Sequence, residues 1–151
     1  MTLWQTIATE AERESALWGN SLRPEADREH ETVFSELAAE RFALGLETIY
    51  EGYLVHYGRP RLFAPPDPDA ALLLGDYLYA HGLVRIAELG ELDAIRRLAD
   101  LISRCARLRA EGQPGDGEAW AETAVGLGRD GGHAEPGGAL ATHARRIDSA
   151  P

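Results

Sequence analysis

Hydrophobic residues recur at helical spacing along most of this chain, and that periodicity limits the fold classes open to it. Apolar side chains three and four positions apart share one face of an α-helix, whereas a half-buried strand alternates apolar and polar residues. No stretch of the sequence alternates in this way. We therefore predict an all-α protein built as a helical bundle.

The pattern predicts four main helices. Their expected spans are 3–20, 33–57, 70–89 and 91–110. The second helix should stop at Gly58, and a rigid loop with three prolines should separate it from the third. Asp69 is the expected N-cap of the third helix, because its short side chain can accept a hydrogen bond from the first turn. The fourth helix is the most regularly amphipathic, and its apolar stripe includes Cys105, which we interpret as a buried apolar side chain.

The composition changes beyond Gly112. Glycines punctuate the remaining residues, and the only helices expected there are short ones around Trp120 and Leu140. Segments of this kind bury little apolar surface. The sequence therefore predicts a helical domain over 1–112 and an irregular, weakly packed, Gly- and Pro-rich tail over 113–151.

Charge and hydropathy limit the partners. The formal net charge is -10 at pH 7, and an acidic surface repels nucleic acids and anionic membranes. The longest apolar run, at 70–74, is too short to span a bilayer, and the first residues lack the basic start and apolar run of a secretory signal. We expect no nucleic-acid partner, no membrane span and a cytoplasmic location.

Five short strings carry a resemblance to a known family. They are Gly-Asn-Ser-Leu-Arg-Pro at 19–24, Leu-Glu-Thr-Ile-Tyr with Leu-Val-His at 46–56, Gly-Arg-Pro at 58–60, Leu-Leu-Gly-Asp-Tyr-Leu-Tyr-Ala at 73–80 and Glu-Gly-Gln at 111–113. The first resembles the Gly-Lys-x-Leu-Arg-Pro motif of the trans-polyprenyl diphosphate synthases, and the others resemble later segments of that family. They occur in the family's order and at close to its spacing.

The resemblance implies a fold and an interface. The chain would correspond to the N-terminal half of the isoprenoid synthase fold, and half of such a bundle leaves an apolar helix face uncovered. Helices from this region build the dimer interface in the family. We therefore expect a homo-oligomer, or a hetero-oligomer with a full-length prenyl synthase, through the third and fourth predicted helices, with Tyr79 and Leu83 at the contact.

The aspartates that the family's chemistry needs are missing. In these synthases, Mg²⁺ ions bridge a diphosphate leaving group to Asp-Asp-x-x-Asp motifs on two facing helices. The first motif should follow His56, but the sequence continues directly into Tyr57 and Gly58. The chain also ends before the position of the second motif. Asp67 and Asp69 are better explained as a solvated turn and a helix cap. We expect no metal site, no cofactor and no catalytic residue, and so no catalysis by this chain alone.

The resemblance also suggests two ligand-binding residues. Arg23 stands where the family has a diphosphate-binding arginine, and Arg59 follows the position of the missing motif, so both are candidate diphosphate ligands. The cationic partners in this pocket are reduced, since Asn20, Tyr50 and Tyr57 stand where the family has Lys, His and Arg. Each lost charge-assisted hydrogen bond weakens binding by about 1.5–3 kcal/mol. Arg23 is equally compatible with an ordinary surface arginine.

Three functions remain open on the sequence. The first is a non-catalytic small subunit or regulator of a full-length prenyl diphosphate synthase, because two-component synthases with a small, aspartate-poor subunit exist in the family. The second is a module that binds an isoprenoid or prenyl diphosphate without reacting it. The third is a helical scaffold or interaction protein.

Overall fold

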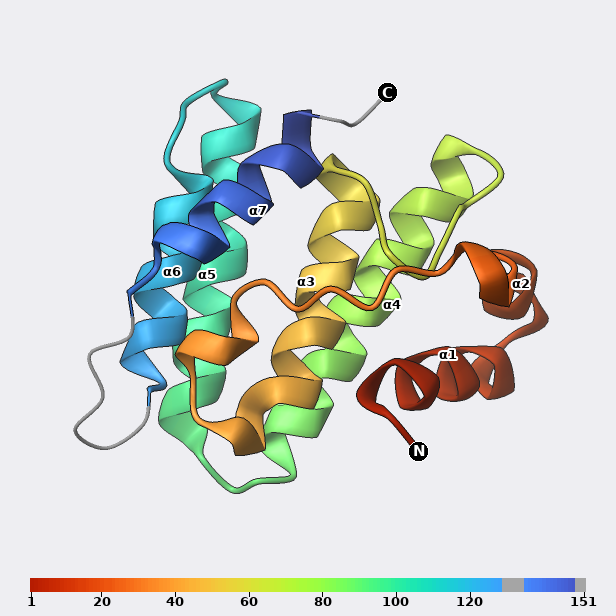
Figure 1. Cartoon of the computed structure of the whole chain (residues 1–151), viewed down its shortest axis with the longest axis horizontal. Coiled ribbons are helices and arrows are strands. Elements are labelled where there is room, and N and C mark those ends of the chain that lie inside the picture. Colours follow the sequence, from red (N-terminus) through yellow and green to blue (C-terminus); the bar gives the residue numbers. More distant parts are fainter. Residues whose placement is uncertain (129–134, 149–151) are drawn as a thin grey trace.

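The computed structural model describes residues 1–128 and 135–148, and within these ranges all the regular structure is helical, which confirms the all-α prediction. Figure 1 shows seven α-helices in this part of the chain: α1 Leu3–Glu14, α2 Ala16–Asn20, α3 Ala43–Tyr57, α4 Pro68–Ala87, α5 Leu92–Ala110, α6 Asp116–Gly126 and α7 Gly137–Asp148. Short 3₁₀ turns at 25–27, 35–37 and 40–42 lie in the segment between α2 and α3.

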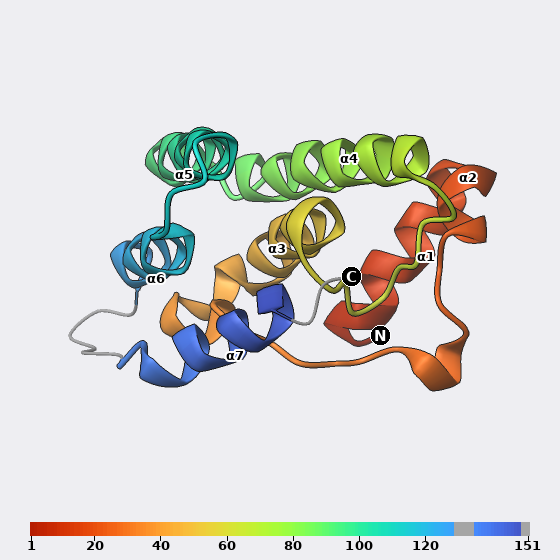
Figure 2. The same cartoon turned by 90° about the horizontal axis from the view of Figure 1, so that it is seen from above.

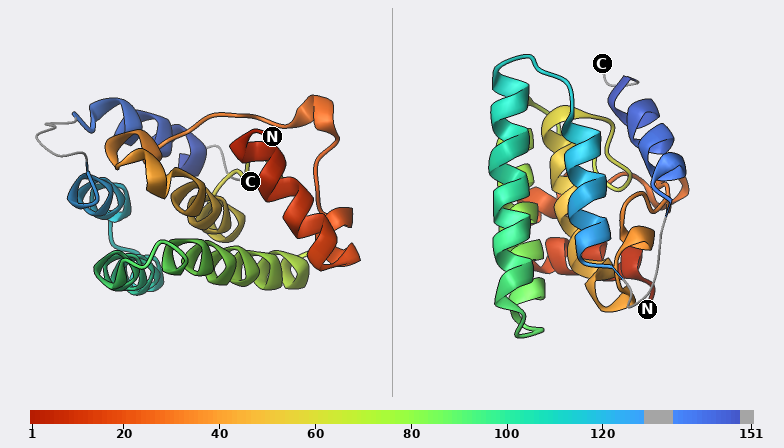
Figure 3. Two further views of the ribbon diagram at one scale, coloured as in Figure 1. Left: turned by 90° about the horizontal axis from the view of Figure 1, so that it is seen from below. Right: turned by 90° about the vertical axis from the view of Figure 1, so that its left-hand side faces the viewer.

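Helix α3 lies at the centre of the bundle. Figure 2 shows α4 and α5 on one side of it, α7 and the segment before α3 on the other, and α1 across the end of α4. In Figure 3, α6 lies between α5 and α7. Every residue from Gly45 to Val55 is buried, as expected for a helix that neighbours cover on all sides.

Glycines let α3 and α4 approach each other closely. A Cβ added at Gly52 of α3 would lie 2.9 Å from the carbonyl oxygen of Gly75 in α4, and one added at Gly82 would lie 3.0 Å from the carbonyl oxygen of Gly45. These contacts are too short for any side chain, so the two backbones pack directly against each other. The α3–α4 pair, which we term the rigid spine, is the central packing unit of the fold.

A buried ion cluster joins the segment before α3 (21–42) and the loop between α3 and α4 (58–67) to α3. Arg61 is fully buried, and its guanidinium donates hydrogen bonds to Glu47 at 2.5 Å and to Glu51 at 3.0 Å, both on α3. The Glu51 carboxylate also accepts the backbone N–H of Leu62 at 2.7 Å, and Glu47 accepts that of Val33 at 3.3 Å. Burial alone would lower the pKa of Arg61, but the two carboxylates raise it, so the guanidinium stays charged.

Two predicted helices differ from the observed ones. The helix expected over 33–57 begins only at Ala43, and the first predicted helix is interrupted at Ser15, which is extended and caps α2 through a hydrogen bond from the backbone N–H of Leu17. Before Ala43 the backbone bonds elsewhere: the N–H of Ala39, for example, donates to the carbonyl of Leu127 at 2.8 Å. Tertiary contacts therefore replace helical hydrogen bonds in a segment whose apolar spacing looked helical.

The expected cap of α4 is also corrected. Asp67, not Asp69, is the N-cap, and its side chain accepts the backbone N–H of Ala70 at 2.7 Å. Pro68 then occupies the first helical position, where its missing N–H and fixed φ cost nothing. Asp69 lies within the first turn, where a carboxylate still interacts favourably with the helix dipole.

The prediction of a weakly packed tail over 113–151 is wrong for the residues that the structure describes. The helices expected around Trp120 and Leu140 are confirmed as α6 and α7, but Trp120 is only 1% exposed. It packs against Phe34, with ring centroids 5.6 Å apart, and belongs to the same hydrophobic core as α3 and α5. The boundary predicted at 112 therefore separates no domains. Residues 129–134 and 149–151 of the predicted tail lie outside the described residues.

Replacing Trp120 by Ala should lower the free energy of unfolding by about 3–5 kcal/mol, because it removes the largest buried side chain of α6. Urea denaturation followed by circular dichroism would measure this. Val125 on the same helix is 40% exposed, and Val125→Ala should stay within about 0.5 kcal/mol of the unmodified protein. Equal effects of the two substitutions would mean that α6 is not part of the core.

Replacing Arg61 by Met should lower the free energy of unfolding by about 3–5 kcal/mol, since Glu47 and Glu51 would remain buried without their cation. Arg59→Met is the matched control: this arginine is 36% exposed in its ion pair with Glu29, and such pairs contribute about 0.2–1 kcal/mol. Adding Glu47→Gln and Glu51→Gln to Arg61→Met should restore part of the lost stability. Failure of any such recovery would contradict a charge-based cause.

Candidate functional site

The described residues offer neither a metal cluster nor a membrane segment. Within 1–128 and 135–148, no three His, Cys, Asp or Glu side chains converge in a way that would hold a metal ion. Over the same ranges, no helix combines the length and the hydropathy that crossing a bilayer requires. The remaining candidate sites are surface pockets, ionisable clusters and the outer helix faces.

Arg23 lies where the chain after α2 pairs with the loop before α4. Its backbone N–H donates to the carbonyl of Leu62 at 2.8 Å, and its Nε donates to the carbonyl of Phe63 at 3.2 Å. Arg28 in turn donates from Nε to the carbonyl of Arg23 at 3.0 Å. Backbone carbonyls thus fix both guanidinium groups, and both residues line one surface pocket of about 570 Å³ beside Asn20 and Glu12.

The structure does not bring Arg59 to this pocket. Its guanidinium is 2.8 Å from a carboxylate oxygen of Glu29, and its backbone N–H donates to the carbonyl of Arg146. The two predicted diphosphate ligands are therefore in different surroundings, and Arg28, which the sequence did not single out, is the arginine that lies beside Arg23. Two fixed guanidinium groups can hold a small anion, although the Glu12 carboxylate on the same rim opposes one.

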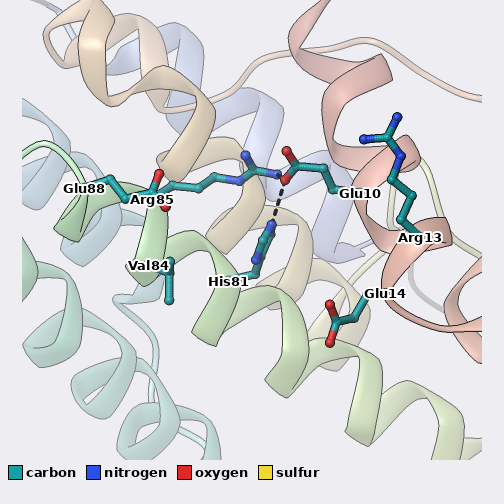
Figure 4. A pocket seen from close by; sticks show the side chains of 7 residues that line it. All are labelled: Glu10, Arg13, Glu14, His81, Val84, Arg85 and Glu88. Carbon is teal, nitrogen blue, oxygen red and sulfur yellow. Dashed lines mark hydrogen bonds and ion pairs between the residues drawn. The ribbon is translucent and has the colours of Figure 1, made fainter.

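A second pocket, of about 320 Å³, lies between α1 and α4. Figure 4 shows Glu10 reaching from α1 toward His81 and Arg85 of α4, and its carboxylate accepts hydrogen bonds from them at 2.8 and 2.6 Å. The hydrogen bond from His81 and the charge of Arg85 together hold the pKa of Glu10 below its ordinary value, against the effect of burial. These contacts attach α1 to α4, and Val84 lies on the same pocket wall.

A polar cluster that we term the Asp116 centre lies where α3, α5, α6 and α7 meet. The Asp116 carboxylate accepts hydrogen bonds from the Tyr53 hydroxyl at 2.5 Å, from Arg109 at 2.5 Å and from His143 Nε2 at 3.0 Å. The other ring nitrogen of His143 lies 2.7 Å from the Tyr50 hydroxyl. A neutral His143 that donates from Nε2 and accepts at Nδ1 satisfies every one of these polar atoms.

The charges and hydrogen bonds of the Asp116 centre are those of a structural contact that links helices. Burial alone would raise the pKa of Asp116, but the hydrogen bonds from His143, Tyr53 and Arg109 outweigh it and hold the pKa well below its ordinary value. Burial raises the pKa of Tyr50 and of Tyr53, so both hydroxyls stay protonated. His143 is only 4% exposed. The centre joins four helices through one charged acceptor and leaves little of the imidazole open to a substrate.

Tyr79 and Leu83, the two predicted interface residues, are partly buried and pack against the internal core. Burial also raises the pKa of Tyr79. The outward face of α4 is instead formed by a set that we term the α4 stripe: Leu73, Ala80, Val84 and Ala87. Leu73 is 56% and Val84 51% exposed. These residues are spaced by seven, four and three positions, so they share one side of the helix, and the exposed Asp76 lies between Leu73 and Ala80 on that side.

The outward face of α5 is different. Its exposed residues include Arg96, Asp100, Arg104 and Arg107, whereas Leu98, Leu101 and Cys105 face the core. The interpretation of Cys105 as a buried apolar side chain is confirmed, and burial raises the pKa of its thiol to about 12. Leu92 in its first turn is 68% exposed, but the other exposed apolar residues of α5 are the small Ala99, Ala106 and Ala110. Beyond the first turn of α5, the large exposed apolar side chains of this helix pair therefore lie on α4.

Compared with known protein families, curated proteins and solved structures, the chain matches none. The site therefore has to be interpreted from its own geometry. Sequence reasoning missed the partners of the Asp116 centre, because residues from positions 50 to 143 meet there only in the folded chain.

Asp116→Asn should lower the free energy of unfolding at pH 7 by about 1.5–3 kcal/mol, the value of a hydrogen bond to a charged group. Because the pKa of Asp116 is lowered by folding, its contribution is complete above the unfolded value of about 4 and is lost as the pH falls below it. The gap between variant and unmodified protein should therefore be smaller at pH 3 than at pH 7 in urea titrations. Glu118→Gln, at an exposed position of the same helix, should show no such pH-dependent gap.

Proposed function

We propose that this chain is a non-catalytic relative of the trans-polyprenyl diphosphate synthases that acts as a small subunit or regulator of a full-length synthase. The α4 stripe carries the proposal. Leu73 and Val84 are each more than half exposed on one side of a long, rigid helix. Exposed apolar side chains gathered on one side of a helix are typical of a protein–protein contact.

The shape of the stripe suits a helical partner. Ala80 lies near the middle of the stripe and Ala87 near its end, and both are exposed. Small side chains let another helix come close, while the larger Leu73 and Val84 fill the grooves of that helix. Because α4 packs backbone to backbone on α3 through Gly75 and Gly82, the stripe is held in place before any partner binds, which reduces the entropy cost of binding.

Charge favours an unlike partner over a second copy. Exposed acidic residues lie at the ends of the stripe (Asp69 and Glu88) and between Leu73 and Ala80 (Asp76), and the whole chain carries a net charge of -10. A second copy would place carboxylates opposite carboxylates, which repel each other. A partner with an apolar helix bordered by Lys or Arg would be complementary on both counts.

The family assignment rests on the sequence strings at 19–24, 46–60, 73–80 and 111–113. They lie on α2 and the loop after it, on α3 and its end, on α4 and at the end of α5. The sequence that follows His56 lacks the aspartates that would bind Mg²⁺ and the diphosphate leaving group. A helical chain with this ancestry and an open α4 face is best explained as a component that assists a catalytic chain.

The proposal is tested by mixing the purified chain with a purified full-length trans-prenyl synthase encoded in the same genome. Light scattering after size exclusion should show a complex of the two chains. Val84→Glu should weaken the complex at least about tenfold, because it buries a charge in the contact. Ser103→Glu adds the same charge at an exposed position of α5 and should leave the complex intact.

Two outcomes would overturn the proposal. One is that no complex forms with the synthase at micromolar concentrations. The other is that Val84→Glu and Ser103→Glu bind equally well, which would remove α4 from the contact. In a parallel assay with Mg²⁺, an allylic diphosphate and isopentenyl diphosphate, the chain alone should form no elongated product. Turnover by the chain alone would contradict its assignment as a non-catalytic component.

A further inference from the structure

Helix α7 is attached to the rest of the molecule mainly through polar side chains. Among its residues the buried ones are His143 and Arg146. Ala139, Leu140 and Ile147 are only partly buried against the core. The preceding helix differs, since α6 buries Trp120 and three alanines. Polar contacts stabilise a docked state less than apolar ones do, because each charged group loses its water on docking.

Arg146 makes the most extensive of these contacts. Its guanidinium lies 2.8 Å from Glu29 and 3.1 Å from Glu31, two residues of the segment that precedes α3, and it donates to the carbonyl of Arg59 at 3.1 Å. Its Nε has no hydrogen-bond partner in the part of the chain that the structure describes. Glu29 is shared with Arg59. Two carboxylates therefore hold the end of α7 through Arg146. This cation is buried, and one of its hydrogen-bond donors has no partner among the described residues.

The fit of α7 against its neighbours depends on two glycines. A Cβ added at Gly117 of α6 would lie 2.9 Å from the His143 ring, and one added at Gly58 would lie 3.2 Å from the carbonyl oxygen of Arg146. The C-terminal half of the docked helix, from His143 to Arg146, thus lies close against the backbone at these two glycines. Such a surface is complementary to α7 without making large apolar contacts with it.

A group of aromatic rings lies beside α7. Phe34, Tyr50 and Trp120 contact one another, with centroids 5.1 to 5.6 Å apart, and all three belong to other elements. His143 lies 5.5 Å from the Phe34 ring and 5.8 Å from the Tyr50 ring. Contacts among α3, α6 and the segment before α3 would keep this group assembled if α7 left, and the departure of His143 would uncover it.

We propose that α7 is a detachable cover, which undocks as a unit from a folded body of α1–α6 and thereby exposes the aromatic surface formed by Phe34, Tyr50 and Trp120. The cover is held in its C-terminal half, by Arg146 and, one turn earlier, by His143 in the Asp116 centre. Helical units joined by polar interfaces open at a lower free energy than the core they cover. This property is independent of the α4 stripe and of the proposed subunit role.

Hydrogen exchange of the whole chain tests the proposal. In the unmodified protein, the amides of α7 should exchange at least about tenfold faster than those of α3, and their exchange should depend little on urea, because a local opening exposes little surface. Arg146→Met should accelerate exchange in α7 by at least about a further tenfold and leave α3 unchanged. Arg145→Met removes the neighbouring exposed arginine and should change neither helix.

Dye binding gives a second readout. Arg146→Met should bind more of a dye that fluoresces on exposed apolar surface, with helical content reduced by no more than α7 itself, and Arg145→Met should not. The proposal fails if α7 and α3 of the unmodified protein exchange at the same rate with the same urea dependence, since the two would then open only together. It also fails if Arg146→Met accelerates exchange equally in both helices. The unmodified protein decides the question even if the variant does not fold.

Discussion

The buried cluster of Arg61 with Glu47 and Glu51 is the interaction on which the rest of the fold depends. One guanidinium, fully buried, forms ion pairs with two carboxylates on the central helix and also lies 4.7 Å from the ring of Trp4 in α1. The same carboxylates accept backbone N–H groups from two loops that have few helical hydrogen bonds of their own. Because buried charges are tolerated only when they are paired and hydrogen-bonded, these loops have one favourable arrangement around α3.

Polar contacts attach several outer helices to the centre of the molecule. Glu10 joins α1 to α4, Asp116 joins α5 and α6 to α3, and Arg146 joins α7 to the segment before α3. The interior of α3 and α4 is instead packed through glycines and large apolar side chains. The molecule therefore combines a rigid apolar spine with peripheral helices whose positions are set by specific charges. Specific charges fix orientation well, but contribute less net stability than the apolar core.

This division explains why the functional proposals concern helix faces. The inner surface of the bundle is filled, and the larger pockets lie open on its rim, between α1 and α4 or beside Arg23. The α4 stripe belongs to the rigid spine, which suits it to a lasting contact with another chain. Helix α7 belongs to the polar periphery, which suits it to reversible release. The helix that carries the α4 stripe is attached to the core by apolar packing, whereas α7 is attached mainly by charged and polar contacts.

The sequence by itself determined the helical class, the positions of α4 and α5, and the helices around Trp120 and Leu140. Each of these follows from local spacing, since a helix forms its own hydrogen bonds and its faces can be counted from residue to residue. Only the tertiary structure decided that residues 33–42 are not α-helical, that α6 and α7 pack on the core, and that Arg28, rather than Arg59, lies beside Arg23. It alone placed Tyr79 and Leu83 inward and Val84 outward. These outcomes depend on partners distant in sequence, such as Glu47 for Val33 and Asp116 for His143, and residue spacing carries no information about which distant charges meet.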